Sequence, residues 1–227
     1  MKPHLPFKVG QYAEAKCFST GFRGAWFRCK IRNINVTDER MKLYLEYYDF
    51  PDEKMEWKKL YSKRHRYDTK EHLMVRPRYP PVNCEGELLD TTNDSEIMVV
   101  VNDVWKEGDL VDWWRDGCYW SGKLTKKLTK KTFQIELLPE PDGEGSSYEA
   151  DCKDLRPSLV WSPEHGWTLP IPEGGKSVSP CARLVHPKAH QGRTSNPVTT
   201  EVREEYRPPK SSTNKEGYLS RLITDQS

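Results

Sequence analysis

The residues of this sequence best suited to chemistry are aromatic side chains that stand close to a carboxylate. A cluster of electron-rich rings beside an acid binds an alkylated ammonium, and each ring face contributes about 0.5 to 2 kcal/mol. All eight Trp and all six Phe lie within residues 1–167, and Tyr47-Tyr48-Asp49 places two rings beside an acid. This combination favours the binding of a cation.

Patterns typical of catalysis or metal binding do not occur in the sequence. There is no GxSxG element, and the histidines fall in segments expected to be loops or tail. The six cysteines form no CxxC pair, so we expect free thiols and neither a disulfide framework nor a zinc site. Residues 174–177, GGKS, lack the first glycine, the strand and the helix of a phosphate-binding loop. We therefore predict a non-enzymatic protein that uses no cofactor and no metal.

Composition bounds the class of protein further. The 227 residues carry 36 Lys and Arg against 34 Asp and Glu, which leaves a net charge of +2. No segment approaches the roughly 20 apolar residues of a membrane span, and residues 1–10 contain no signal-peptide core. We therefore expect a protein of the nucleus or cytoplasm with no membrane partner.

An internal repeat organises most of the chain. Four local patterns occur twice in the same order: a turn glycine before an alternating run, a strand with two adjacent aromatic residues, a second alternating run, and an aliphatic-Arg-Pro triplet. The paired segments are residues 9–15 and 107–113, 25–31 and 118–124, 41–48 and 132–138, and 75–77 and 155–157. The repeat predicts two small, bent antiparallel sheets of about four or five strands each.

These sheets define the expected domain organisation. The first domain spans residues 5–80 and the second spans residues 104–170. The connector, residues 81–103, contains the largely β-branched run 96–101, which predicts a strand packed between the two copies or shared by them. Residues 171–227 are poor in apolar side chains and contain recurrent prolines, so we expect a disordered tail.

The repeated elements resemble a tandem agenet pair, the plant Tudor-like branch of the royal family of chromatin readers. The resemblance covers about residues 5–170 and rests on GFRGAWF at 21–27, LEYYD at 45–49, EGDLVD at 107–112, YWSGKL at 119–124 and LRP at 155–157. It implies a mostly β protein of two tandem Tudor-like antiparallel β-barrels packed as one unit. It also implies a nuclear location and the recognition of methylated lysine in histone tails.

The resemblance further implies where a methyl-lysine cage lies. In Tudor-like folds the cage walls come from the end of the first strand or its following loop, and from the second and third strands. On the first copy this predicts a cage formed by Trp26, Tyr48, Asp49, Phe22 and Phe18. Tyr47 and Tyr48 must face opposite sides of their strand, and alternation from Leu43 places Tyr47 in the core and Tyr48 outside.

Other residues are assigned to a peptide groove or to the core. The peptide-groove candidates are Glu14, Tyr47, Asp109, Asp112, Trp114 and Tyr119. The second copy has Leu137-Leu138-Pro139 in place of Tyr47-Tyr48-Asp49, so no complete cage is expected there. Most of the tryptophans from Trp113 to Trp167 are expected between the barrels. The residues expected in the core of the first barrel are Phe27, Tyr44, Tyr47 and Trp57.

Two alternatives stay open at the level of the sequence. Basic patches at residues 58–59, 63–66, 126–127 and 130–131, together with the aromatic residues, suit RNA or DNA binding. Such binding is either the main function or an auxiliary contact of a histone reader. The second alternative is a scaffold whose C-terminal tail recruits a protein partner.

Overall fold

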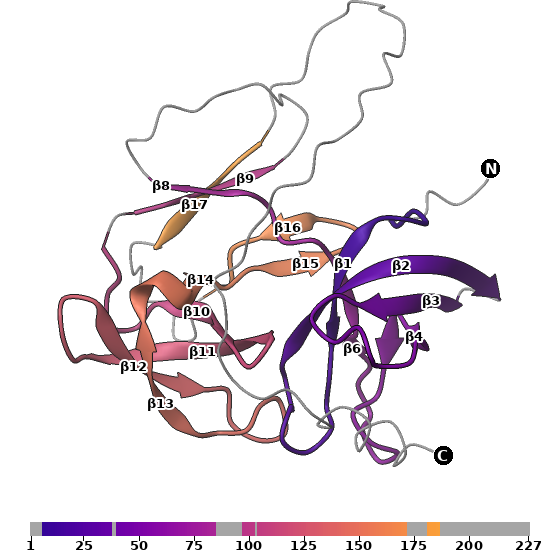
Figure 1. Ribbon diagram of the computed structural model, residues 1–227, viewed down its shortest axis with the longest axis horizontal. Coiled ribbons are helices and arrows are strands. Elements are labelled where there is room, and N and C mark those ends of the chain that lie inside the picture. The colour runs from indigo at the N-terminus through magenta and orange to yellow at the C-terminus, as the bar shows by residue number, and fades with distance from the viewer. Residues whose placement is uncertain (1–5, 38–39, 85–96, 103, 172–180, 187–227) are drawn as a thin grey trace, which may run out of the picture.

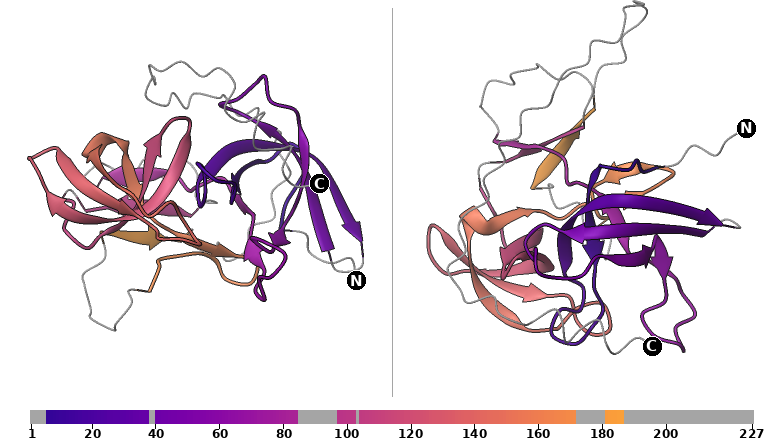
Figure 2. Two further views of the ribbon diagram at one scale, coloured as in Figure 1. Left: turned by 90° about the horizontal axis from the view of Figure 1, so that it is seen from below. Right: turned by 45° about the vertical axis from the view of Figure 1, so that its right-hand side comes forward.

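The computed structural model describes residues 6–37, 40–84, 97–102, 104–171 and 181–186, and the described part consists of β-strands with one short 3-10 turn (Figure 1). Burial alternates along several strands, which separates a core face from an outer face. Two similar groups of strands, here called the first and second units, lie side by side in both figures (Figure 2). Within the described residues, no helix is long and apolar enough to cross a membrane.

The first unit is built around a bent antiparallel sheet with the strand order β7–β1–β2–β3–β4. Its strands, including the separate pair β5 and β6, are β1 (Tyr12–Lys16), β2 (Trp26–Thr37), β3 (Arg40–Tyr47), β4 (Glu56–Lys59), β5 (Tyr61–Ser62), β6 (His72–Leu73) and β7 (Val75–Pro77). The register of β2 against β3 shifts between Ile31 and Asn33, an irregularity of the kind that bends a strand. Leu43 and Leu45 of β3 are fully buried and anchor the core of this unit.

The second unit repeats this strand order as β14–β10–β11–β12–β13. Its elements are β10 (Leu110–Arg115), β11 (Cys118–Lys127), β12 (Thr132–Leu137), β13 (Ser147–Asp151), the 3-10 turn η1 (Cys152–Asp154) and β14 (Leu155–Pro157). The register repeats as well, since Glu14 lies opposite Arg76 in the first unit and Asp112 lies opposite Arg156 in the second. The two Arg-Pro triplets of the sequence therefore occupy equivalent structural positions.

A single bridge joins the two sheets at equivalent residues. Trp26 at the start of β2 pairs with Tyr119 of β11. Within their own units, Trp26 pairs with Lys16 and Tyr119 pairs with Trp114, so the two bridge residues correspond to each other. The units thus meet about a pseudo-two-fold axis. The result is the mostly β, tandem Tudor-like architecture expected from the sequence.

Two smaller sheets complete the structure, and both contribute to the core of the first unit. They are the hairpin of β15 (Val160–Ser162) with β16 (Gly166–Thr168), and the three-stranded sheet of β8 (Val82–Cys84), β9 (Met98–Val101) and β17 (Ala182–Val185). Val99, Val101, Trp161 and Trp167 belong to the same buried cluster as the first-unit residues. The connector strand and the closing tryptophans therefore pack into the core of the first unit. The sequence had placed them between the two copies.

Strand β17 corrects the prediction that the whole segment 171–227 is a disordered tail. It pairs antiparallel with β9, from Ala182 opposite Val101 to Val185 opposite Met98. The pairing partner lies about 80 positions earlier in the chain, so local composition could not reveal it. The remainder of the segment from residue 187 lies outside the described residues.

Tyr44 and Trp57 lie on the outside of the first unit, contrary to the prediction that they belong to its core. They lie opposite each other on β3 and β4, and Trp57 is 46% exposed. Because Leu43 and Leu45 point inward, alternation along β3 turns Tyr44 outward. The prediction that Tyr47 is buried and that Tyr48 is exposed is confirmed.

Candidate functional site

A pocket opens at the end of the first unit where the β1–β2 and β3–β4 loops meet. Its volume is about 120 Å³, close to the roughly 150 Å³ of a protein cavity that accommodates benzene. Its lining residues are Lys16, Cys17, Phe18, Ser19, Phe27, Tyr47, Glu53, Glu56, Lys58, Ser62, Lys63, Arg64 and Met74. The lining thus draws on the loop after the first strand and on the second and third strands. These are the elements from which the sequence resemblance derives cage walls.

Three aromatic rings line this pocket. Phe18 follows β1, Phe27 lies near the start of β2, and Tyr47 ends β3. The rings of Phe27 and Tyr47 pack edge to face with their centroids 6.1 Å apart, and both residues are buried. Phe18 is partly exposed and packs edge to face against His72. The pocket therefore has a buried aromatic floor and one more accessible aromatic wall.

Charged groups surround the aromatic floor. The Tyr47 hydroxyl donates a hydrogen bond to the Glu56 carboxylate, and Lys58 Nζ donates to the same carboxylate at 3.0 Å. Burial by itself raises the pKa of Glu56, but Lys58 and the Tyr47 hydrogen bond outweigh it, and the pKa lies below its usual value. Glu56 therefore carries a negative charge at neutral pH, and Glu53 adds a second carboxyl group to the lining.

Lys16 is a cation whose charge the site itself disfavours. Its Nζ lies 5.1 Å from the centroid of the Phe18 ring and 5.4 Å from that of the Trp26 ring. Burial, together with the charge of Arg76, lowers the pKa of Lys16 to about 8. Two of the predicted cage walls, Phe18 and Trp26, thus already lie against a cation supplied by the protein.

The structure does not gather the predicted cage residues into one site. Of the five, Phe18 alone is among the residues that line the pocket. Trp26 is only 6% exposed at the junction of the units, where the Arg76 guanidinium lies 4.0 Å from the centroid of its ring. The pocket is lined instead by Phe27, the next residue along β2, whose side chain points to the other face of the strand.

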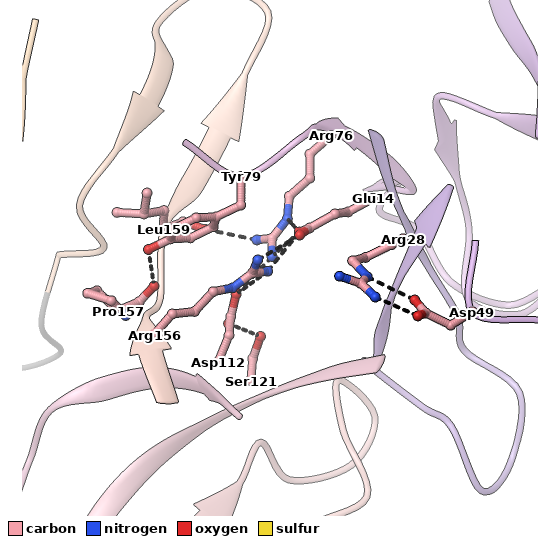
Figure 3. A network of polar contacts seen from close by, with 10 residues as sticks. All are labelled: Glu14, Arg28, Asp49, Arg76, Tyr79, Asp112, Ser121, Arg156, Pro157 and Leu159. Carbon is pink, nitrogen blue, oxygen red and sulfur yellow. Dashed lines mark hydrogen bonds and ion pairs between the residues drawn. The ribbon is translucent and has the colours of Figure 1, made fainter. Parts of the chain in front are cut away.

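Tyr48 and Asp49 also lie away from the pocket lining. The Tyr48 ring is 53% exposed and meets Tyr12 edge to face. Asp49 accepts two hydrogen bonds from Arg28, from Nε at 2.8 Å and from a terminal nitrogen at 2.5 Å (Figure 3). The Arg28 guanidinium also lies 4.4 Å from the Trp114 ring centroid. The carboxylate predicted to contact the ligand is thus already paired with an arginine of the protein.

Phe22 belongs to a loop that covers the second unit. Its ring stacks on Trp120 at 5.8 Å and 22°, and Trp120 is the register equivalent of Phe27. The backbone N–H groups of Gly21 and Arg23 both donate to the Glu144 carboxylate, at 2.8 and 2.9 Å. The first unit therefore covers the ring of the second unit that corresponds to its own pocket floor.

Two of the peptide-groove candidates, Glu14 and Asp112, are buried between the units. With Arg76 and Arg156 they form a network of two carboxylates and two guanidinium groups, here called the arginine–carboxylate cluster (Figure 3). Arg76 reaches both carboxylates at 2.8 Å. Arg156 reaches Glu14 at 2.7 and 2.8 Å and Asp112 at 3.2 Å. Each carboxylate is thus held by the arginine of its own unit and by that of the other.

Aromatic rings enclose this cluster and keep water away from it. The Arg156 guanidinium lies 3.4 Å from the Tyr119 ring centroid and 4.0 Å from that of Tyr79. Burial alone raises the pKa of Glu14 and Asp112, but the two arginines outweigh it and hold both pKa values below their usual range. Two positive charges face two negative charges, so the cluster is internally balanced. The cluster therefore links strands of both units.

The remaining groove candidates divide between the pocket and the interior. Tyr47 lines the pocket floor. Trp114 and Tyr119 are buried with their ring centroids 4.7 Å apart. Asp109 is also buried and accepts a hydrogen bond from the Lys106 N–H at 2.7 Å. Burial leaves these last three residues no surface for a peptide.

Sequence reasoning named Tyr47 as a groove candidate and Phe27 as a core residue, but it did not recognise that the two together form the pocket floor. Ile31, Cys29 and Phe27 follow one another on the inner face of β2, as Leu45 and Tyr47 do on β3. Continuing both inner faces to the same end of the sheet leads to the pocket floor. The contributions of Glu56 and Lys16 depend on neighbours from other strands and have no comparable local signal.

The fold and the pocket define the protein as a tandem Tudor-like β module with a candidate binding pocket in its first unit. Residues 10–80 match the family model of the Agenet domain. The protein therefore contains an Agenet domain, and its second unit repeats the strand order of that domain.

Two solved structures are similar to this chain. The crystal structure of Arabidopsis thaliana AGDP1 AGD34 has 17% sequence identity and a TM-score of 0.46, over 72% of this chain and 90% of that chain. The crystal structure of the ADCP1 tandem Agenet domain 3-4 has 17% identity and a TM-score of 0.44, over 73% of this chain and 89% of that chain. No curated protein sequence matches the chain.

Proposed function

We propose that the protein is a non-enzymatic chromatin reader of the nucleus that binds a methylated lysine of a histone tail. The ligand enters the pocket of the first unit. The observation that carries this proposal is the presence of an aromatic pocket, with Phe18, Phe27 and Tyr47 in its lining, at the end of an Agenet domain. The C-terminal tail from residue 187 lies outside the described residues, and its binding of a protein partner stays a prediction.

The chemistry of the pocket supports a methylated ammonium as ligand. Methylation removes N–H donors but keeps the positive charge. Aromatic faces and a nearby carboxylate therefore stabilise the methylated ammonium when it leaves its hydrating water. Glu53 and Glu56 supply negative charge at the lining. Four cations of the lining, Lys16, Lys58, Lys63 and Arg64, oppose a cationic ligand, but Lys58 is paired with Glu56 and Arg64 with Asp68 and Asp142. In the second unit Phe22 covers the corresponding ring, so that unit serves as a support.

Replacing Phe18 with alanine should weaken the binding of a trimethyl-lysine peptide about 5- to 30-fold. The loss of one aromatic face from a desolvated cation is worth about 1 to 2 kcal/mol. Phe18 is partly exposed, so the variant should fold. A modified-histone peptide array selects the peptide, and calorimetric titration of the full chain with methylated and unmodified forms measures the change.

Tyr48→Ala is the matched control for this experiment. Tyr48 is an exposed aromatic residue of the same Agenet domain but does not line the pocket. Its replacement should change the affinity by less than about two-fold. If Tyr48→Ala abolished methyl discrimination while Phe18→Ala left it intact, the ligand would bind the outer face and the pocket assignment would be wrong.

Binding of the trimethylated peptide should strengthen as the pH rises from about 7 to about 9. The pKa of Lys16 is about 8, so this lysine loses its charge in that range, whereas trimethyl-lysine keeps its own. Removing a repelling charge beside the ligand should raise the affinity about three- to ten-fold. Titrations at several pH values measure the effect. The Lys16→Met variant should bind the trimethylated peptide tightly at both pH 7 and pH 9. If its affinity still depended on pH as that of the wild type does, Lys16 would not be the source of the pH dependence.

A further inference from the structure

A second surface of the first unit has the composition of a binding face and lies on the opposite side of β3 and β4 from the pocket. We call it the β3–β4 outer face and define it by Arg40, Lys42, Tyr44, Trp57 and Lys59. Tyr44 lies opposite Trp57 in the strand register, and Lys42 lies opposite Lys59. Cross-strand partners share one face of a sheet, so the two aromatic and two basic side chains point to the same side.

Of the aromatic pair on this face, Trp57 is exposed and Tyr44 is half-buried. The ring centroids of Tyr44 and Trp57 lie 5.1 Å apart with an interplanar angle of 33°, and Trp57 is one of the exposed large apolar side chains. The residues that alternate with them, Leu43 and Leu45, fill the core. Burial in the core therefore does not account for this pair, and the exposed Trp57 ring, which packs against Tyr44, offers an aromatic surface for stacking.

The basic residues beside the pair form a positive patch. Arg40, Lys42 and Lys59 line a shallow hollow together with Thr37. Within the described part of the chain, none of these three cations forms an ion pair, whereas Glu46 on the same face is paired with Arg32 at 2.5 Å. Asp38 and Glu39, between β2 and β3, lie outside the described residues. Two lysines directly opposite each other destabilise a sheet, and a bound anion would relieve that repulsion.

We propose that the β3–β4 outer face binds single-stranded nucleic acid. Exposed rings accept stacked bases, and neighbouring cations hold the phosphate backbone, which is the combination used by proteins that bind single strands without sequence preference. An acidic peptide would use the cations but not the paired ring faces. This site does not depend on the pocket, because the pocket residues Tyr47, Glu56 and Lys58 alternate with the outer-face residues along β3 and β4.

Fluorescence anisotropy of the full chain with a labelled 12-nucleotide oligouridine tests this proposal. Trp57→Ala should weaken binding at least about ten-fold, because base stacking on an aromatic side chain contributes strongly to such affinity. Trp57→Phe should retain most of the binding. Tyr67→Ala is the matched control, since Tyr67 is 73% exposed and lies 4.6 Å from the guanidinium of Arg66, and its replacement should have no effect.

The salt dependence of the same binding provides a second readout. Lys42→Gln and Lys59→Gln should each lower the slope of log affinity against log salt by about 0.7, the value for one phosphate contact on a single strand. Relief of the lysine repulsion should leave the melting temperature of either variant unchanged or higher. Absence of oligouridine binding, or equal binding by wild type and Trp57→Ala, would overturn the proposal. The proposal would also be overturned if a duplex bound more tightly than oligouridine and Trp57→Ala left that binding unchanged. Methylated-peptide titration of Trp57→Ala, expected to be unchanged, keeps this test separate from that of the pocket.

Discussion

Replacing Arg156 with methionine is expected to lower the free energy of unfolding by about 3 to 5 kcal/mol, the cost of breaking a buried ion pair by removing one partner. The substitution leaves Arg76 alone to balance the carboxylates of Glu14 and Asp112, which are almost completely buried. Methionine keeps much of the apolar stem that packs against the rings of the cluster, so the loss reports mainly the charge. Urea unfolding followed by tryptophan fluorescence measures it.

Arg32→Met is the matched control for this loss. Arg32 also bonds a carboxylate, with its Nε 2.7 Å from Glu46, but both side chains are more than two-fifths exposed. Exposed ion pairs contribute little, so this variant should lose less than about 1 kcal/mol. Equal losses in the two variants would show that the arginine–carboxylate cluster does not hold the units together.

A double variant separates charge balance from packing in the cluster. Glu14→Gln together with Arg156→Met leaves Arg76 facing Asp112, one positive charge against one negative charge. The double variant should therefore lose less stability than the sum of the two single variants. Strict additivity would mean that the two residues act independently, against the geometry in which Arg156 reaches both oxygens of Glu14.

The repeated fold was predictable because its signals are local. Alternating runs, turn glycines and the Arg-Pro triplets each act within a few residues, and they recur in the same order in both units. The arginines of those triplets were recognised only as marks of the repeat. Their partners, Glu14 and Asp112, are shared across the pseudo-two-fold axis, and no local pattern indicates that two copies of a strand will face each other. Strand β17 escaped prediction for the same reason.

Two of the predicted cage residues each lie next to a residue that lines the pocket. The sequence predicted Trp26 and Tyr48, whereas the pocket is lined by their neighbours Phe27 and Tyr47. In a strand a shift of one residue changes the face, so the predicted cage residues and the pocket residues lie on opposite sides of the sheet. The resemblance indicated Trp26, and alternation from Leu43 indicated Tyr48. In the whole chain the second unit covers Trp26, and only the long-range packing decides this.

Gly24→Ala is expected to destabilise the protein by about 2 to 4 kcal/mol, because it combines backbone strain with overpacking at the contact between the units. Gly24 has a φ of +83°, which disfavours residues with a Cβ. An added Cβ would overlap the carbonyl oxygen of Asp142 and lie 3.3 Å from the Cα of Gly143. These are backbone atoms of the second unit, so neither can move aside as a flexible side chain would. Thermal and urea unfolding of the full chain measure the loss.

Gly21→Ala is the control that measures the backbone part of that loss alone. Gly21 lies in the same loop with a nearly identical φ of +87°, but a Cβ built there meets no atom within 4 Å. It should therefore lose only the backbone contribution, about 1 kcal/mol. The difference between the two glycine variants measures how tightly the GFRG loop is held against the second unit. If both variants lost the same stability, the loop would be free to move away from Asp142, and the covering of Trp120 by Phe22 would not be a fixed feature of the protein.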